Sequence, residues 1–346
     1  MKKILIPPST EYTIGRDLLK QLQEICSGQR AILIADAAIK ETYAADLAKA
    51  IDAELLSIPS GERTKNEEMK QNLLSQLFQL GCDKETLIIA CGGGVTTDLV
   101  GFVASVYMRG LSLILIPTTL LAVVDASIGG KTAINTRYGK NLIGTFYHPK
   151  HIFADLNVLK TLPEKEWFNG LAEILKMGLI YKPAIWESFN FQDPECIFQA
   201  IEGKVEIVTQ DPTEQSIRRI LNFGHTLGHA LELVSDYEMS HGEAVALGCA
   251  AEAHLSMQMG YLSQEDFEQV VRRFSQFSLE LPKKYTRSKL LSALLHDKKK
   301  ARSQTRFVLI DKIGHALAFE GAYCQAVTHA QLEPTLNWME EWKSGR

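Results

Sequence analysis

The fold is decided between residues 86 and 98, which read TLIIACGGGVTTD. Residues 86–90 are a short apolar run typical of a buried strand, and residues 96–107 have the apolar and small-residue pattern of a helix packed on a sheet. Glycines 92–94 therefore stand at a strand-to-helix turn, where backbone N–H groups can approach a phosphate. A Rossmann fingerprint would need glycine at position 97, which is Thr97. Dinucleotide binding and a purely structural tight turn both remain open here.

The same alternation of strand and helix extends through the first half of the chain. Strands alternating with helices at this spacing predict a parallel sheet with helices on both faces. We therefore expect an α/β domain over residues 1–163. The predicted strands are Lys3–Ile6, Ala31–Ala35, Leu55–Ile58, Thr86–Ala90 and Leu113–Ile116, and the predicted helices are Ile14–Ile25, Ala44–Ile51, Glu67–Gln79 and Thr96–Tyr107.

The pattern changes after Leu162-Pro163. Apolar residues then recur with the helical period, and strand-like runs nearly vanish. Arg306–Ile310 is a short apolar exception that we expect to pair with another small segment. Residues 164–346 are therefore predicted to form a mostly α-helical second domain.

Composition excludes several classes of protein. The 346 residues carry 37 Lys and Arg against 41 Asp and Glu, a net charge of −4. A protein that binds mainly nucleic acid usually has a basic surplus, so no nucleic-acid partner is expected. Six scattered cysteines without a CxxC pair favour reduced thiols, and the longest apolar run, Leu111–Val124, is broken by Pro117. We expect a cytoplasmic protein without a membrane segment.

Two lysines stand beside glycines in the segment 127–141. Ser127–Thr132 invites comparison with a phosphate-binding P-loop, but that motif needs glycine where Asp125 stands. Lys131 and the Gly139-Lys140-Asn141 turn remain either solvated surface or anion contacts.

The second half carries a cluster of histidines and one acidic candidate. His225 and His229 are four residues apart on a predicted helix, His241 follows, and Glu173 and Lys176 share a face of another helix. Two histidines and a carboxylate form a ligand set for a catalytic Zn²⁺. Each histidine alone could equally be a hydrogen-bonded core residue, but the cluster favours a metal site. Basic and polar residues that mark either a solvated helix face or an anionic substrate are Lys204, Arg218, Asn222 and the run Asp297–Lys300.

Taken together, these motifs resemble the 3-dehydroquinate synthase family of the sugar-phosphate cyclases. The blocks that carry the resemblance are PSGERTK at 59–65, GGGVTTD at 92–98, IPTTLLA at 116–122, DASIGGKTAIN at 125–135, GKNLIG at 139–144, GLAE at 170–173, LNFGHT at 221–226 and HGEA at 241–244. The resemblance implies an N-terminal nucleotide-binding domain, a helical metal-binding domain and a homodimer with shared active sites. It implies a lyase of the shikimate pathway that converts 3-deoxy-D-arabino-heptulosonate 7-phosphate to 3-dehydroquinate and phosphate, using catalytic NAD and Zn²⁺ or Co²⁺.

The resemblance also assigns roles to individual residues. It makes Glu173, His225 and His241 the metal ligands, with His229 on the substrate side, and it directs Arg109 to the phosphate site of the neighbouring subunit. It implies NAD contacts from Asp36, Glu62, Lys65, Gly93, Gly94, Val95, Asp98, Thr118, Thr119, Lys131, Lys140 and Thr161. It implies substrate contacts from Asp125, Lys131, Asn141, Lys176, Lys204, Arg218, Asn222 and one of Lys298 and Lys299.

Three alternatives stand beside this interpretation. Another sugar-phosphate cyclase would differ mainly in pocket residues, and Asp98, Asp125 and the run Ser127–Lys131 favour the dehydroquinate branch. A glycerol-dehydrogenase-like oxidoreductase would lack the phosphate-binding lysines and Arg109. A non-catalytic binding protein would be expected to have lost a ligand or a pocket lysine, and the sequence keeps them all.

Overall fold

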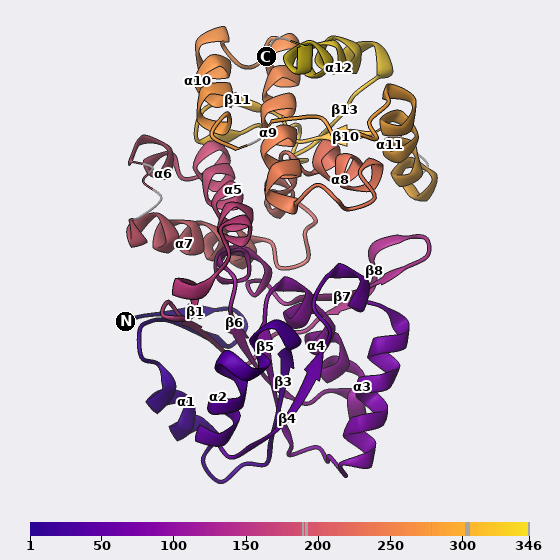
Figure 1. Ribbon diagram of the computed structural model, residues 1–346. Helices are drawn as coiled ribbons and strands as arrows, with labels where there is room; N and C mark the ends of the chain where they lie inside the picture. The colour runs from indigo at the N-terminus through magenta and orange to yellow at the C-terminus, as the bar shows by residue number, and fades with distance from the viewer. Residues whose placement is uncertain (189, 191–192, 278, 302–304, 345–346) are drawn as a thin grey trace. The chain divides into compact units, whose positions relative to one another are not determined.

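The computed structural model describes residues 1–188, 190, 193–277, 279–301 and 305–344, except for the side chains of 295–301 and 343–344. The chain divides into two compact units, Met1–Trp167 and Phe168–Arg346 (Figure 1). The division falls within a helix, α5 (Glu164–Ile180).

A seven-stranded sheet with the order β1-β2-β9-β6-β5-β3-β4 forms the centre of the first unit. Neighbouring strands run parallel except β1, which pairs antiparallel with β2 at one edge. The predicted α/β fold with a parallel sheet is confirmed. The strands are β1 (Lys2–Ile6), β2 (Thr10–Gly15), β3 (Ala31–Asp36), β4 (Ala53–Ile58), β5 (Leu87–Gly92), β6 (Ser112–Pro117) and β9 (His151–Asp155).

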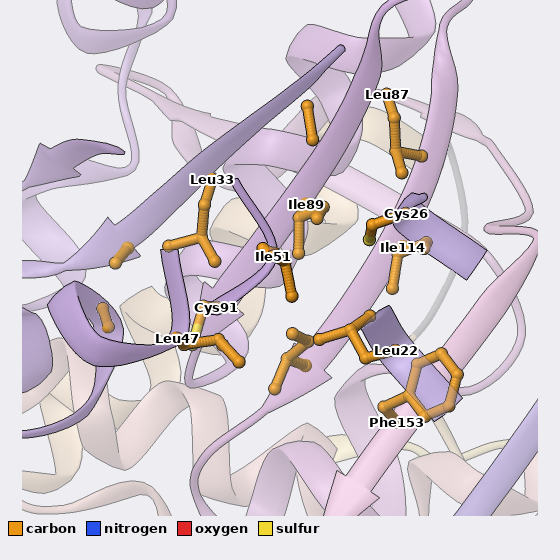
Figure 2. Close-up of a cluster of buried hydrophobic side chains, with 14 of the residues drawn as sticks. Leu22, Cys26, Leu33, Leu47, Ile51, Leu87, Ile89, Cys91, Ile114 and Phe153 are labelled. Atoms are coloured by element: carbon orange, nitrogen blue, oxygen red, sulfur yellow. The ribbon is translucent and has the colours of Figure 1, made fainter. Parts of the chain in front are cut away.

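Helices cover both faces of this sheet. α1 (Leu19–Cys26) and α2 (Ala45–Ala50) lie on one face, and α3 (Glu67–Gln79) and α4 (Gly94–Val106) lie on the other (Figure 1). Figure 2 shows the first interface, where Leu22 of α1, Leu47 of α2 and Ile51, which directly follows α2, meet Leu33 and Ile89 of the strands. Because side chains alternate along a strand, the intervening residues of β3 and β5 face α4, and both strands are buried on both faces.

The prediction of a helix over Ile14–Ile25 is wrong at its start. Ile14 belongs to β2, and the helix begins only at Leu19. Strand β2 lies between β1 and β9, and its Tyr12 is fully buried, with its hydroxyl donating to the Val123 carbonyl oxygen at 2.7 Å. Tertiary pairing, together with the β-branched and aromatic residues of 10–14, outweighs the helical spacing of the apolar residues.

Three further strands lack a sequence prediction. β9 completes the sheet, while β7 (Lys131–Thr136) and β8 (Gly139–Phe146) form a separate antiparallel hairpin. The interpretation of Lys131 and Lys140 as residues on glycine turns is therefore corrected, since both lie on strands. Gly129 and Gly130, directly before β7, both have positive φ, as do Gly139 and Asn141 at the start of β8.

The second unit is mostly helical, as the sequence predicts. Its helices are α5, α6 (Pro183–Ser188), α7 (Pro194–Gln210), α8 (His225–Val234), α9 (His241–Gln258), α10 (Gln264–Phe274), α11 (Arg287–Ala301) and α12 (His329–Ser344). α9 is buried on nearly all sides and contacts α8, α10 and α12, which makes it the central helix. The predicted apolar exception forms β10 (Arg306–Phe307), paired with β13 (Gln325–Ala326), and β11 (Ile310–Lys312) pairs with β12 (His315–Ala316). Among the described residues, no helix is both long and apolar enough to cross a membrane.

Substitution of a leucine inside the core of Figure 2 should affect stability more than substitution of an exposed leucine outside it. Leu33 is fully buried on β3, whereas Leu5 on β1 is 70% exposed. Leu33→Ala should lower the free energy of unfolding by about 3 kcal/mol, because it removes buried methyl groups and leaves a cavity. Leu5→Ala, the control, should change it by less than about 0.5 kcal/mol. Urea unfolding of both variants measures the two changes in the free energy of unfolding. Equal changes would contradict the burial of Leu33.

Candidate functional site

The candidate nucleotide residues of the first unit follow the carboxyl ends of neighbouring parallel strands. Asp36 ends β3, Gly93 follows β5, and Thr118 follows β6. Glu62 lies in a short 3₁₀ helix, Glu62–Thr64, after β4. In open α/β sheets this edge is where ligands bind. The parallel topology therefore brings together residues that are far apart in the sequence.

The glycine turn between β5 and α4 is closely packed. A Cβ atom on Gly92 would lie 2.4 Å from Thr96 Oγ1, and one on Gly93 would lie 3.0 Å from Thr119 Cγ2. The first hydrogen bond of α4 runs from Thr97 N to Gly93 O, so residues 94–96 present their N–H groups at the helix N-terminus. The turn thus serves both as a structural necessity and as a place where a phosphate anion is favoured.

A buried lysine joins three segments beside this turn. Lys65 is 4% exposed and forms an ion pair with Asp98 on α4. Its Nζ also donates to Asn141 Oδ1 on β8 at 2.6 Å. Asn135 extends the network, since it accepts from Asn141 N at 3.0 Å and donates to Glu62 Oε1 at 2.7 Å. Residues predicted as separate NAD and substrate contacts are therefore linked in one polar cluster.

Asp36 is held in place at the end of β3. Its Oδ1 accepts from Ala38 N at 2.9 Å and from the hydroxyl of Ser60. A carboxylate fixed at the end of a strand in a parallel sheet is typical of groups that bind ribose hydroxyls.

The other predicted residues of the first unit are more dispersed. Asp125 lies in a short helix, Ala122–Ala126, Lys131 begins β7 and is exposed, and Lys140 lies on β8. Arg109 is exposed and has φ +68° before Gly110 at φ +121°. Val95 lies in the first turn of α4, and the Thr119 hydroxyl accepts from Ala122 N at 3.2 Å. Thr161 is exposed, and its hydroxyl donates to the Val158 carbonyl oxygen at 3.4 Å.

The second unit brings one carboxylate and two imidazoles together from three helices. Glu173 lies on α5, and His225 and His241 are the first residues of α8 and α9. The Nε2 atoms of His241 and His225 lie 3.0 and 3.2 Å from Glu173 Oε1. The three potential ligand atoms all lie within 4.8 Å of one another. Three protein ligands of these types suit a catalytic divalent metal with an open position, so the residues fit the predicted metal.

Charge around this triad favours the ionised carboxylate. Burial alone would raise the pKa of Glu173, but the ion pair with Lys176 and the neighbouring His225 hold it well below its ordinary value. Burial likewise lowers the pKa of His241, whereas the carboxylates of Glu173 and Glu232 raise it, and their effect is the larger one. A metal ion that binds here must therefore displace a proton from His241.

Each ligand histidine has an acceptor beside its other ring nitrogen. His225 Nδ1 lies 3.2 Å from the Phe223 carbonyl oxygen, and His241 Nδ1 lies 3.7 Å from Glu232 Oε1. A partner for Nδ1–H leaves Nε2 with its lone pair directed to the metal, which is the usual arrangement in metal sites.

The predicted substrate residues of this unit lie on α5, α7 and the segment before α8. Lys176 Nζ donates to the Leu221 carbonyl oxygen at 2.6 Å, and Lys204 is buried on α7. Arg218 and Asn222 lie in a 3₁₀ helix, Ile217–Asn222, that leads directly to His225. Asn222 Nδ2 donates to Glu214 Oε1 at 2.6 Å.

Asp211 shapes the loop that precedes Arg218. Its carboxylate accepts backbone N–H bonds from Gln215, Ser216 and Arg218 at 2.9, 2.6 and 3.0 Å. Arg218 is 2% exposed, and its Nη1 donates to the Pro212 carbonyl oxygen at 2.6 Å. The guanidinium is thus fixed by its own loop.

His229 lies apart from the ligand triad. It is exposed on α8, with its ring centroid 5.1 Å from that of His225 and 6.5 Å from that of His241. Lys298 and Lys299 belong to α11, but their side chains lie outside the described residues.

Several residues that support these sites have no role predicted from the sequence. Ser60 and Asn135 bond to predicted cofactor residues, and Glu232 lies beside His241. Asn169 and Glu252 contact the backbone at the starts of α9 and α8. For Asn169 and Glu232 the available signal was their position, one or two helical turns from a predicted ligand, while Ser60, Asn135 and Glu252 carried no such signal.

Comparison with known proteins identifies the class. Residues 55–169 match the family model described as 3-dehydroquinate synthase N-terminal, and residues 170–300 match the one described as C-terminal. A 3-dehydroquinate synthase of Helicobacter pylori (strain HPAG1) is 40% identical, over 99% of this chain and 100% of the relative. One of Thermodesulfovibrio yellowstonii is 38% identical, over 90% of this chain and 91% of the relative.

Solved structures show the same architecture. A 2-deoxy-scyllo-inosose synthase complexed with carbaglucose-6-phosphate, NAD⁺ and Co²⁺ has a TM-score of 0.88 at 24% identity, covering 97% of this chain and 98% of its own. ValA, a 2-epi-5-epi-valiolone synthase from Streptomyces hygroscopicus with NAD⁺ and Zn²⁺ bound, has a TM-score of 0.86 at 26% identity, covering 99% of both chains. The fold is therefore that of NAD- and metal-containing cyclases. Within this class, the chain belongs to the 3-dehydroquinate synthase family.

The triad predicts different consequences for two neighbouring histidines. His241→Ala should abolish tight metal binding and activity, because one of three ligands is lost, and should leave the fold intact because His241 is only half-buried. His229→Ala should retain the metal, because His229 is not one of the three candidate ligands, and should lose turnover, because the family resemblance places it on the substrate side. Metal content measured after gel filtration separates the two variants. Loss of metal from the His229 variant alone would show that the ligand assignment is wrong.

Proposed function

We propose that the protein converts 3-deoxy-D-arabino-heptulosonate 7-phosphate to 3-dehydroquinate and phosphate in the shikimate pathway. The observation that carries this proposal is the Glu173, His225 and His241 triad in a chain 40% identical to a 3-dehydroquinate synthase over nearly its full length. The two cyclases of other specificity are 24% and 26% identical, which favours the dehydroquinate reaction over theirs. A probable glycerol dehydrogenase of Sinorhizobium meliloti, at 14% identity and a TM-score of 0.63, is more distant still.

The two halves of the chain divide the chemistry. We assign residues 1–163 to NAD binding and residues 164–346 to the metal and most of the substrate contacts, with Asp125, Lys131 and Asn141 of the first half also proposed to contact the substrate. When bound, NAD⁺ supplies a hydride acceptor, and a divalent metal such as Zn²⁺ or Co²⁺ lowers the pKa of coordinated hydroxyls and polarises a developing carbonyl.

The chain's own residues bind and orient the reactants. We propose that the N-terminus of α4 and Lys65 bind the anionic part of the cofactor, which is supported by the unpartnered N–H groups of that helix and the positive charge of Lys65, and that the carboxylate of Asp36 binds a ribose. Lys131, Asn141, Lys204, Arg218, Asn222, Asp125 and one of Lys298 and Lys299 are proposed to hold the anionic sugar phosphate. The substrate phosphate is dianionic, and one of its own oxygens can take the C6 proton. A strong protein base is therefore not required.

Catalytic use of NAD gives the next prediction. Because 3-dehydroquinate and phosphate together have the composition of the substrate, the hydride removed from C5 must be returned within the same turnover. A reaction with one tenth as much NAD⁺ as substrate should therefore run to completion without NADH accumulating. Absorbance at the NADH band follows the accumulation of NADH, and a phosphate assay follows the completion of the reaction. Stoichiometric NADH would instead indicate a dehydrogenase.

We further propose a cytoplasmic homodimer in which Arg109 reaches the phosphate site of the partner subunit. All six cysteines lie in the described part of the chain and none is in a disulfide, which suits a reducing compartment. Arg109 is exposed on a turn with positive φ, so its guanidinium is available to an anion outside its own fold. A bidentate guanidinium suits a dianionic phosphate.

Subunit mixing tests this arrangement. Arg109→Ala should remove a charge-assisted pair and about 2–4 kcal/mol of transition-state stabilisation, or roughly 30- to 1,000-fold in rate. His241→Ala should also be nearly inactive alone. A heterodimer of the two variants rebuilds one intact site, so mixing under subunit exchange should restore a fraction of wild-type activity. No recovery at all would mean that Arg109 acts within its own chain or outside catalysis.

A further inference from the structure

Both ligand histidines are the first residues of their helices. His225 begins α8 and His241 begins α9. The position of each imidazole therefore depends on where its helix starts and on how that start is held against the neighbouring helices. The first N–H groups of a helix lack intrahelical partners, so side chains or solvent must bind them.

The start of α9 is capped locally and is also held by α5. Ser240 and Glu243 form a capping box, with Ser240 N donating to Glu243 Oε2 at 2.8 Å. In addition, Gly242 N donates to Asn169 Oδ1 at 2.7 Å. Asn169 lies one turn before Glu173 on α5, so this bond connects the helix of the carboxylate ligand to that of His241.

The start of α8 is held in a different way. Its N-cap residue is Gly224, at φ +78°, and this residue offers no side-chain cap. Instead Glu252, on α9, accepts from Gly224 N at 2.7 Å with Oε2 and from Leu227 N at 3.2 Å with Oε1. The backbones are in close contact here, since a Cβ atom on Gly248 of α9 would lie 2.0 Å from Gly224 O.

Local capping would have been a less costly way to stabilise α8. Glu252 is fully buried, and a carboxylate is expensive to bury unless both of its oxygens are hydrogen-bonded. Burial raises the pKa of Glu252 to about 8, while its N–H donors act in the opposite direction. A serine at the N-cap would cap α8 but would not connect it to α9. Only a side chain from α9 fixes His225 relative to His241.

We propose that Glu252 is a positioning residue of the metal centre, which sets the placement of His225 relative to His241 by bonding both ends of the first turn of α8. The inference rests on the proposed metal site. It adds a residue that contacts neither metal nor substrate. The carboxylate also lies at the positive end of the α8 dipole, where it offsets a field that would otherwise oppose a bound cation.

Glu252→Gln is the informative variant. Glutamine is nearly isosteric with glutamate and keeps one acceptor oxygen for one backbone N–H of α8. Its amide N–H₂ would face the other backbone N–H and could not accept from it. The protonated acid would likewise present its hydroxyl to that N–H. At a pH above the pKa of Glu252, we expect the dissociation constant of Zn²⁺ to rise by about 10- to 100-fold in chelator competition. We also expect the visible absorption bands of the Co²⁺-loaded protein to change, because the ligand geometry changes.

Ser256→Ala provides the matched control. Ser256 is also fully buried on α9, one turn beyond Glu252, and its hydroxyl accepts from Ile310 N at 3.2 Å. The same hydroxyl donates to the Glu252 carbonyl oxygen at 2.8 Å, so Ser256→Ala removes side-chain bonds next to Glu252 but leaves the Glu252 carboxylate and its bonds to α8 in place. Both variants should lower the melting temperature of the metal-free protein to a similar extent, but only Glu252→Gln should weaken metal binding and alter the Co²⁺ spectrum.

The outcomes separate the inference from the proposed function. If Glu252→Gln keeps the wild-type Zn²⁺ affinity and an unchanged Co²⁺ spectrum, Glu252 only stabilises the fold. That result would overturn the inference but leave the proposed metal centre intact. Equal weakening by Ser256→Ala would overturn it as well, since general destabilisation would then explain the loss. Failure of the wild-type protein to bind either ion would overturn the metal centre itself, and the inference with it.

Discussion

The burial of the Glu173 carboxylate is the constraint on which the second unit depends. An ionised carboxylate at 3% exposure is stable only if positive or donating groups surround it. Lys176, one turn along α5, and the imidazoles of His225 on α8 and His241 on α9 meet this need. Helices α5, α8 and α9 must therefore converge for the unit to fold. A divalent ion would satisfy the same requirement more strongly, so the cost of burying Glu173 connects folding of the unit to metal binding.

The first unit has a comparable constraint at the glycine turn after β5. A side chain on Gly92 or Gly93 would collide with Thr96 or Thr119, so the turn allows close approach of β5, α4 and the segment after β6. The same close approach leaves the N-terminus of α4 facing the carboxyl ends of the strands. The sequence alone left a structural turn and a phosphate site as alternatives. The two alternatives do not exclude each other, because the packing that needs glycine also leaves the first N–H groups of α4 without intrahelical partners.

Prediction of the fold succeeded where burial produces an uninterrupted pattern. Strands β3, β5 and β6 are buried on both faces and read as apolar runs. It failed for β2, whose residues owe their strand conformation to pairing with β1 and β9. It also failed for β8, which is exposed along most of its length and has little hydrophobic signal. Strands that depend on partners distant in sequence leave few traces in their own residues.

The same distinction applies to the site. Glu173, His225 and His241 could be predicted because metal ligands must be specific residue types, and their motifs are recognisable in the chain. Glu252 and Asn169 could not, because what they bind is backbone N–H, which every residue but proline carries. Their partners on other helices follow from the tertiary arrangement alone. The types of residue in a ligand set can thus be predicted from the sequence. The placement of those ligands relative to one another depends on buried polar side chains, and the identity of such a side chain does not reveal this role. In the metal centre that we propose, the starts of α8 and α9 are where that placement would be set, since each of these two helices begins with a candidate ligand.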